Sequence, residues 1–565
     1  MYQQVYDPVS DSLGLSSIFA VLPLITLFVL LGGVKLKAWW AGLAALAVAV
    51  VVAIAVYSMP VGQTLLSGSE GAAFGLFPIM WIVVNALWIY NMTVKTGEFA
   101  ILRRSFGTIS DDQRVQAVII AFCFGALLEA LAGFGTPVAI TAVMLIALGF
   151  QPMKAGAVAL VANTAPVAFG AIAIPIVTLA EITGLPKEDL GAMVGRQTPL
   201  LALFVPLILV GMVDGTRGIR QTWPAAIVGG LVFAIGQFAT SNYISVELTD
   251  IVASLLATGA IVALLRVWQP SEPLLGDPSE GRFNRPALAG ASTADPSFEA
   301  DVRRRHAARG GGGGDEPQDT PREVVLAYAP YAIIIAIFAL AQWGPIKDFL
   351  EGRTREFTWP GLDVRNADGE AVSSITYTFN WLAAAGTLLL VAGVITMVVL
   401  RMNPGRAVRT WVETLDQLKW AILTVAAVLA LAYVMNQSGQ TTTLGLWAAG
   451  AGGVFAILSP IIGWLGVAVT GSDTSSNSLF GQLQVAAAKD AGLSQTLMAA
   501  ANSSGGVLGK MISPQNLAIC AAAVGLGGRE GDLFRRVVGW SLLLLLIMCV
   551  LVYLQSTSLL SWMVV

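Results

Sequence analysis

Two similar stretches, NTAPVAFGAIAIP at residues 163–175 and NSSGGVLGKMISP at residues 502–514, lie in opposite halves of the sequence. Each stretch begins with Asn and a hydroxyl residue, has Gly at its eighth position and ends with Pro at its thirteenth. The flanking residues are apolar in both cases. Because Gly is flexible and Pro cannot continue a helix, the pattern predicts an interrupted helix in each half.

The sequence around these stretches indicates an all-α protein that crosses a membrane many times. Of 565 residues, 56% are hydrophobic and 12% are charged, whereas soluble domains carry about 25% charged residues. Apolar runs long enough to span a bilayer recur along the chain, and we expect roughly 12–14 transmembrane helices. The net charge of −3 predicts no nucleic-acid surface.

Charged loops divide the chain into two membrane halves. Residues 268–323 are rich in Pro, Gly and charged residues, which predicts a disordered cytoplasmic insert between an N-terminal half, residues 1–267, and a C-terminal half, residues 324–565. Basic residues cluster in loops that alternate with the spans, and placing them inside puts both termini outside. These loops contain Arg217 and Arg220 in the first half and Arg529, Arg535 and Arg536 in the second.

The same alternation makes the first stretch run outward and the second run inward. A further break precedes each stretch, at Gly133, Gly135 and Pro137 in the first half and at GSDTSSNS from Gly471 in the second. Broken elements at matching places in two halves of opposite orientation are typical of inverted-topology transporters, which bind substrate there. The broken elements are expected near residues 129–137, 163–175, 471–481 and 502–516.

Such breaks expose groups that suit a small organic anion. The start of a resumed half-helix presents N–H donors and a partial positive charge, and glycines let the backbone approach a ligand. The competing interpretation is that small residues there serve only close helix packing. The expected substrate-binding residues are Gly133, Gly135, Thr136, Asn163, Thr164, Ser472, Thr474, Ser475, Asn477, Asn502, Ser503 and Ser504.

Three ionisable residues lie within the apolar sequence of these elements, and charges inside a membrane are functional candidates by default. Glu129 precedes the first break and Asp473 lies in the third. We expect one of them to take up and release a proton, although either could be a structural charge at a helix end. Lys510, in the second stretch, is expected to pair with one of these carboxylates or to bind the anion.

The sequence does not favour an enzyme, a metal site or a channel. The only histidine, His306, falls in the polar insert, and the cysteines lack metal-ligand spacing. There is no Ser-His-Asp set and no HExxH motif, so no catalytic residue, metal or cofactor is expected. A channel usually builds its pore from several subunits, whereas an internal inverted repeat is typical of a carrier.

Several segments together resemble the bacterial L-lactate permease family over nearly the whole chain, the polar insert excepted. They are FCFGALLEALAGFGTPVAI, NTAPVAFGAIAIPI, VGRQTP, GSDTSSNSLFGQLQ and AANSSGGVLGKMISPQN. The resemblance implies a symporter in the inner membrane of a bacterial cell. It implies that L-lactate moves with a proton, with glycolate and D-lactate as related substrates.

A wider resemblance leaves the coupling ion open. ANTAP and ANSSG look like the Ser-Asn-Thr signatures of sodium-coupled dicarboxylate carriers, but both lack the leading Ser. This likeness also suggests an elevator-type carrier with broken-helix binding elements. A sodium-coupled carboxylate carrier is therefore the nearest alternative to a proton symporter, and an anion channel is the next.

Overall fold

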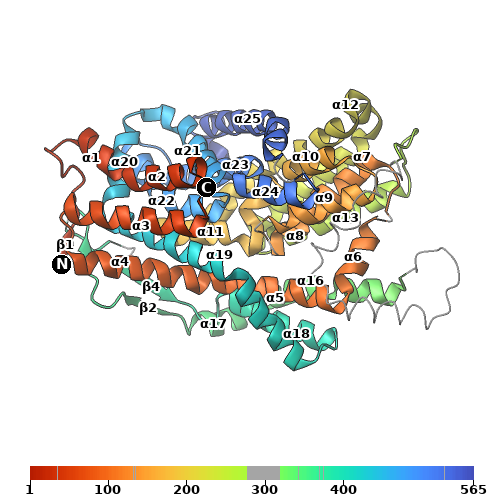
Figure 1. Cartoon of the computed structure of the whole chain (residues 1–565), viewed down its shortest axis with the longest axis horizontal. Coiled ribbons are helices and arrows are strands. Elements are labelled where there is room, and N and C mark those ends of the chain that lie inside the picture. The colour runs from red at the N-terminus through yellow and green to blue at the C-terminus, as the bar shows by residue number, and fades with distance from the viewer. Residues whose placement is uncertain are drawn as a thin grey trace.

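The computed structural model describes residues 1–34, 36–107, 109–131, 133, 135–275, 319–341, 343–367, 369–372, 375–526 and 529–565. The described part of the chain is almost entirely helical (Figure 1). Most of the insert expected at residues 268–323, including His306, lies outside the described residues.

The described N-terminal half contains one short strand and a series of helices. π-helical turns interrupt two helical segments, at Gly75–Met80 and Ala117–Phe124, and a third such turn, Val29–Gly33, ends the segment that contains α2. Its elements are β1 (Tyr2–Gln3), α1 (Leu13–Ala20), α2 (Leu22–Phe28), α3 (Ala38–Ala55), α4 (Val61–Phe74), α5 (Trp81–Thr96), α6 (Glu98–Gly107), α7 (Gln113–Gln116), α8 (Gly125–Leu131), α9 (Thr136–Ala147), α10 (Pro152–Ala162), α11 (Gly170–Thr183), α12 (Lys187–Tyr243) and α13 (Thr249–Leu265).

The described C-terminal half adds three short strands, and β1 pairs with β3 while β2 pairs with β4. Its elements are α16 (Pro321–Ala341), α17 (Gly344–Glu351), β2 (Arg355–Thr358), β3 (Val364–Arg365), β4 (Thr376–Phe379), α18 (Ala385–Val399), α19 (Pro404–Ser438), α20 (Gln440–Ala449), α21 (Phe455–Thr470), α22 (Asp473–Asp490), α23 (Gln495–Gly509), α24 (Pro514–Ala523) and α25 (Glu530–Gln555).

The expected all-α membrane fold is confirmed. Among the described residues, nine helical segments are long and apolar enough to cross a membrane, and one bent pair gives a tenth. Sequence reasoning expected roughly 12–14 spans. Shorter apolar helices, such as Thr249–Leu265 and Ala385–Val399, and a kink at Asp214 and Gly215 within α12 account for the larger expected number.

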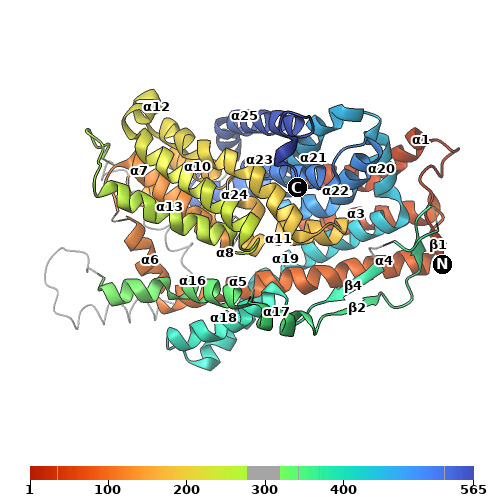
Figure 2. The ribbon, with the colours of Figure 1, turned by 180° about the vertical axis from the view of Figure 1, so that it is seen from behind.

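The helices form two groups, which lie on opposite sides of the molecule in both views (Figures 1 and 2). The first group contains α4, α5, α16, α18 and α19. In it α19 packs on α4, and α18 packs on α5 and α16; α19 also packs on α3, outside this group. The second group contains α8 to α13 and α21 to α25, and the interrupted elements predicted from the sequence all belong to it.

Within this second group the two halves repeat the same order of elements. α8 and α9 meet at a break where Gly135 is left-handed (φ 80°), and α21 and α22 meet at a break where Gly471 is left-handed (φ 77°). In each half a second interrupted pair follows, α10 with α11 and α23 with α24. α9 packs on α24 and α11 packs on α22, so each half contacts the breaks of the other. The opposite orientation of the two copies in a bilayer stays a prediction.

Candidate functional site

The first stretch, residues 163–175, separates α10 from α11. Asn163 is the C-terminal cap of α10. Residues 171–173 then adopt φ values between 45° and 59°, a left-handed conformation that is rare for residues other than Gly. The helical segments on either side of the break are bent by 66°. The interruption predicted from the Gly and Pro pattern is therefore present.

The second stretch, residues 502–514, separates α23 from α24 at a different residue from the one expected. Asn502 lies inside α23, which continues to Gly509. A single 3-10 turn, Lys510–Ile512, follows, and Pro514 begins α24. When the two stretches are aligned, this turn coincides with residues 171–173. Both stretches therefore contain an irregular turn directly after the shared Gly, but α10 already ends at Asn163, whereas α23 continues past Asn502.

A buried ion pair joins the two stretches. The Lys510 ammonium contacts Glu129 Oε1, and the two side chains are 8% and 3% exposed. Asn163 Nδ2 donates a hydrogen bond of 2.9 Å to Glu129 Oε2. A Cβ atom at Gly170 would lie 2.9 Å from Glu129 Oε1, so only Gly leaves room for the carboxylate there. Of the two carboxylates expected as partners of Lys510, the structure shows Glu129 in contact with it, and contact of Lys510 with a substrate stays a prediction.

A second polar cluster surrounds Asp473 at the start of α22. Ser503 Oγ donates to Asp473 Oδ2 over 2.5 Å, and Asn477 Nδ2 lies 3.4 Å from the same oxygen. Asn477 Nδ2 also donates to the carbonyl oxygen of Pro175 over 3.1 Å. Asn502 Nδ2 donates to Asn477 Oδ1 over 2.9 Å. Asn477 therefore connects the polar residues of the second half to the end of the first stretch.

The two clusters are close enough to influence each other. Lys510 interacts electrostatically with Asp473 as well as with Glu129. All of these residues are buried, with whole-residue exposed fractions of 6% or less. The described conformation is thus closed around the two breaks, and the charged groups interact in surroundings where water screens them little.

Four buried polar atoms at the breaks have no hydrogen-bond partner among the described residues. They are Asn163 Oδ1, Thr164 Oγ1, Asp473 Oδ1 and Ser504 Oγ. A buried polar atom without a partner costs about 1–3 kcal/mol. A small polar ligand that reached these acceptors and hydroxyls would remove that cost, which is the property expected of a binding site.

Other expected residues have structural roles at the breaks. Ser472 Oγ caps α22 by accepting from Ser475 N over 3.2 Å. Gly133 is left-handed (φ 49°) and leaves space beside Glu129. Thr136 and Thr474 each lie in the first turn of a resumed helix, after Gly135 and after Ser472. Contact between any of these residues and a substrate stays a prediction.

Sequence reasoning missed Asp250, in the first turn of α13. Its carboxyl is buried, and Gln237 Nε2 donates to its Oδ1 over 2.9 Å. Gln237 Nε2 also reaches the carbonyl oxygen of Ala165, inside the first stretch, over 3.3 Å. Asp250 Oδ2 has no partner among the described residues, and the carboxyl interacts electrostatically with Glu129. The only sequence signal for Asp250 was an acidic residue in the first turn of an apolar helix. Such a residue ordinarily indicates only a favourable interaction with the helix dipole.

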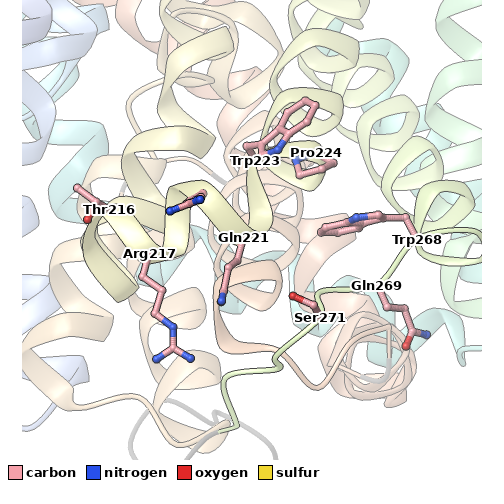
Figure 3. A pocket seen from close by; sticks show the side chains of 9 residues that line it. Thr216, Arg217, Gln221, Trp223, Pro224, Trp268, Gln269 and Ser271 are labelled. Atoms are coloured by element: carbon pink, nitrogen blue, oxygen red, sulfur yellow. The ribbon is translucent and has the colours of Figure 1, made fainter.

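Two surface pockets lie away from these clusters. One of about 800 Å³ lies beside the kink of α12 (Figure 3), and one of about 550 Å³ lies beside the N-terminal segment from Gln3 to Asp7. The residues of the breaks line neither of them. Neither pocket is therefore part of the candidate site.

Known proteins are similar to this chain over its whole length. A family model described as L-lactate permease matches residues 16–559. The L-lactate permease of Bacillus subtilis (strain 168) is 41% identical, with all of both chains covered. The glycolate permease GlcA of Escherichia coli (strain K12) is 40% identical, with 98% of each chain covered. Among solved structures, the YdaH transporter of Alcanivorax borkumensis is 15% identical over 86% of both chains, with a TM-score of 0.43, too distant to assign a role to any residue.

Proposed function

The chain belongs to the L-lactate permease family, and from this premise we propose that it imports L-lactate together with a proton across the inner membrane of a bacterial cell. Glycolate and D-lactate are proposed as further substrates, which the similarity to a glycolate permease supports. Both termini are proposed to lie outside. No bound cofactor takes part, and the proton is the coupling ion.

Import of lactate needs coupling because lactate is an anion at neutral pH. Moving one negative charge into a negatively charged cell costs about 2.3 kcal/mol per 100 mV. A proton that travels with the anion cancels this cost and adds the pH gradient as a driving force. The carrier therefore needs a group that is ionised when the site is empty and takes up a proton when the anion binds.

The Glu129–Lys510 pair is the observation that supports this proposal most directly. A lactate carboxylate that binds Lys510 takes the place of Glu129 and leaves that carboxylate buried without a cation. An uncompensated buried charge is strongly unfavourable, and protonation of Glu129 removes it. Binding of lactate and binding of a proton then favour each other, as reciprocal linkage requires.

Asp473 fits the same role less well. It forms no salt bridge among the described residues, so binding of an anion to Lys510 removes no direct partner from it. Asp473 interacts electrostatically with Lys510, and Asp250 interacts electrostatically with Glu129. Of the two carboxylates expected from the sequence, we therefore assign proton uptake to Glu129.

The polar atoms without partners supply the remaining contacts in this proposal. The hydroxyls of Thr164 and Ser504 donate to the substrate carboxylate beside Lys510, and Asn163 Oδ1 accepts from the 2-hydroxyl group. A short 2-hydroxy acid carries both groups on adjacent carbons, so it meets donors and acceptors together. Acids without the 2-hydroxyl leave the Asn163 oxygen unpaired and bind less well.

Uptake of radiolabelled L-lactate into proteoliposomes tests this function. An inward proton gradient should drive accumulation above equilibrium, a protonophore should abolish it, and replacement of sodium by choline should leave it unchanged. Unlabelled glycolate and D-lactate should compete better than acetate. Accumulation that requires sodium would instead establish a sodium-coupled carrier, and downhill flux without saturation would indicate a channel. Empty liposomes provide the baseline.

A further inference from the structure

The kink in α12 is held in place by a buried arginine. The backbone is non-helical at Asp214 and Gly215. The Arg114 guanidinium, fully buried, donates to Asp214 Oδ2 over 3.0 Å and to Gln221 Oε1 over 2.6 Å. It also donates to the carbonyl oxygen of Glu272 over 2.6 Å, which fixes the segment that follows α13. The bend and this segment therefore form one structural unit.

The pocket of about 800 Å³ lies between the bend and this segment. Figure 3 shows Trp223 and Trp268 on one side of the pocket, while the Arg217 side chain points away from the two indoles. Arg220 and Gln221 also line it. The pocket thus has an aromatic side and a basic side, an arrangement common at the boundary between bilayer and water, where Trp is enriched.

The basic side carries a positive charge that the protein leaves largely available. Arg220 is exposed and forms no salt bridge within the part of the chain that the structure describes. Arg217 pairs with Glu272 over 2.7 Å, but the two side chains are 60% and 64% exposed. Such an exposed pair contributes little to stability, so a better anionic partner can replace Glu272.

An exposed apolar stripe continues from the pocket along α12. Trp223, Leu231 and Ile235 are 55%, 44% and 58% exposed, and their spacing places them on one face of the helix. In a membrane protein such a face contacts the acyl chains of lipids. The stripe begins at the aromatic side of the pocket, so a molecule with a charged head and an apolar tail can contact both features.

We propose that this pocket binds an anionic phospholipid. The lipid phosphate contacts Arg217 and Arg220, the glycerol region lies between the two indoles, and one acyl chain follows the stripe on α12. Basic pockets between spans on the cytoplasmic side commonly recognise lipid headgroups, and loop charges place Arg217 and Arg220 on that side. A soluble phosphate would contact the arginines but not the stripe. The proposal does not depend on which solute is transported.

Native mass spectrometry of the delipidated full-length protein tests this site with phosphatidylglycerol and phosphatidylcholine of identical acyl chains. The protein should retain phosphatidylglycerol more tightly. Arg217→Gln/Arg220→Gln should weaken that binding by about thirtyfold, since two basic residues near a surface contribute about 1 kcal/mol each and about 1.4 kcal/mol corresponds to a factor of ten. Arg217→Lys/Arg220→Lys keeps the charge and should retain most of the phosphatidylglycerol binding. That result would show that the loss of binding in the Gln variant does not come from misfolding.

Arg536→Gln is the matched control, because Arg536 is also an exposed arginine near the start of a span but lies on α25. It should leave binding of phosphatidylglycerol unchanged. Equal affinity for the two lipids, or an equal loss in Arg536→Gln, would overturn the proposal. Displacement of the lipid by millimolar inorganic phosphate would also overturn it, since the pocket would then be a site for a soluble anion.

Discussion

The ammonium of Lys510 contacts the carboxylate of Glu129, although the two residues are 381 positions apart in the sequence. Glu129 belongs to α8 of the N-terminal half, and Lys510 begins the turn between α23 and α24 of the C-terminal half. Both side chains are buried. A buried charge is costly when it loses its partner, so the contact ties the two halves together at their breaks.

Replacing Glu129 by Gln is expected to uncouple transport from the proton gradient. The amide has a similar shape and still accepts from Asn163, but it cannot take up a proton. Glu129→Gln should exchange internal for external lactate, while accumulation driven by an inward proton gradient falls to simple equilibration. Both activities are measured with radiolabelled L-lactate in proteoliposomes.

Glu70→Gln is the matched control for this experiment. Glu70 is also buried and accepts a hydrogen bond of 2.7 Å from Gln437 Nε2, but it lies on α4, in the other group of helices. Glu70→Gln should accumulate lactate as the wild type does. Undiminished accumulation by Glu129→Gln would remove Glu129 from the coupling role.

Lys510→Met is expected to destabilise the fold, because it leaves Glu129 buried without its cation. Removing one partner of a buried ion pair costs about 3–5 kcal/mol. The double variant Glu129→Gln/Lys510→Met no longer contains a stranded charge and should recover most of the lost Tm without recovering lactate uptake. Thermal unfolding in detergent measures the first effect and proteoliposome uptake the second. If the double variant is no more stable than Lys510→Met, the Glu129–Lys510 ion pair does not stabilise the contact between the two halves.

The positions of the breaks could be predicted from the sequence because they depend on local chemistry. Gly170 with Pro175, and Gly509 with Pro514, mark these breaks because Gly and Pro weaken helices, although Pro alone does not decide them, since Pro199, Pro206 and Pro224 lie inside α12. The role of Asn502 could not be predicted in this way. It lies within α23, where Gly505 packs against Pro460 of α21 with no room for a Cβ atom. For Gly505, close helix packing is the correct interpretation.

The partners of the charged residues could not be predicted from the sequence, because tertiary packing brings them together. Glu129 and Lys510 were recognised as candidates from their apolar surroundings, but only the packing of the two halves shows that they meet. Asp250 was missed for the same reason. Its link to the first stretch runs through Gln237, on a different helix, and no local pattern predicts that contact.

Ser504→Ala is expected to separate stability from binding. Ser504 Oγ is buried without a hydrogen-bond partner, so its removal should leave Tm unchanged or raise it. If the hydroxyl binds the substrate carboxylate, its loss removes a hydrogen bond and KM for lactate should rise roughly two- to tenfold. Ser503→Ala is the contrasting variant, because Ser503 already donates to Asp473 over 2.5 Å and its loss should lower Tm. An unchanged KM in Ser504→Ala would place the substrate elsewhere.

Gly170→Ala is expected to impair both folding and uptake. The new Cβ atom would lie 2.9 Å from Glu129 Oε1 and 3.2 Å from its Cγ. Glu129 is held by Lys510 and Asn163, so it cannot move aside without breaking one of these contacts. Overpacking of this kind costs about 1–3 kcal/mol. Gly62→Ala is the control, since a Cβ atom there meets nothing within 4 Å. Tm and lactate uptake should both fall in Gly170→Ala, and neither should change in Gly62→Ala.

Asp112→Asn is expected to change how stability depends on pH. Asp112 contacts Arg114 over 2.6 Å, with both side chains buried, and accepts from Leu274 N over 3.0 Å. Burial alone would raise the pKa of Asp112, but these hydrogen bonds and the Arg114 charge hold the pKa below its ordinary value. The folded state therefore binds the proton less readily than the unfolded state, whose pKa is about 3.9.

The sign of the effect follows from that order of pKa values. Ionised Asp112 stabilises the fold fully above the pKa of the unfolded state, and this stabilisation is lost as the pH falls through the lower pKa of the folded state. Asp112→Asn should consequently lower Tm at pH 7, and the difference from wild type should shrink as the pH is brought below about 4. Asp416→Asn removes an exposed carboxylate that pairs with Lys419 and should change Tm little at either pH. A Tm difference for Asp112→Asn that is the same at both pH values would show that the side chain acts through packing, since only its charge titrates.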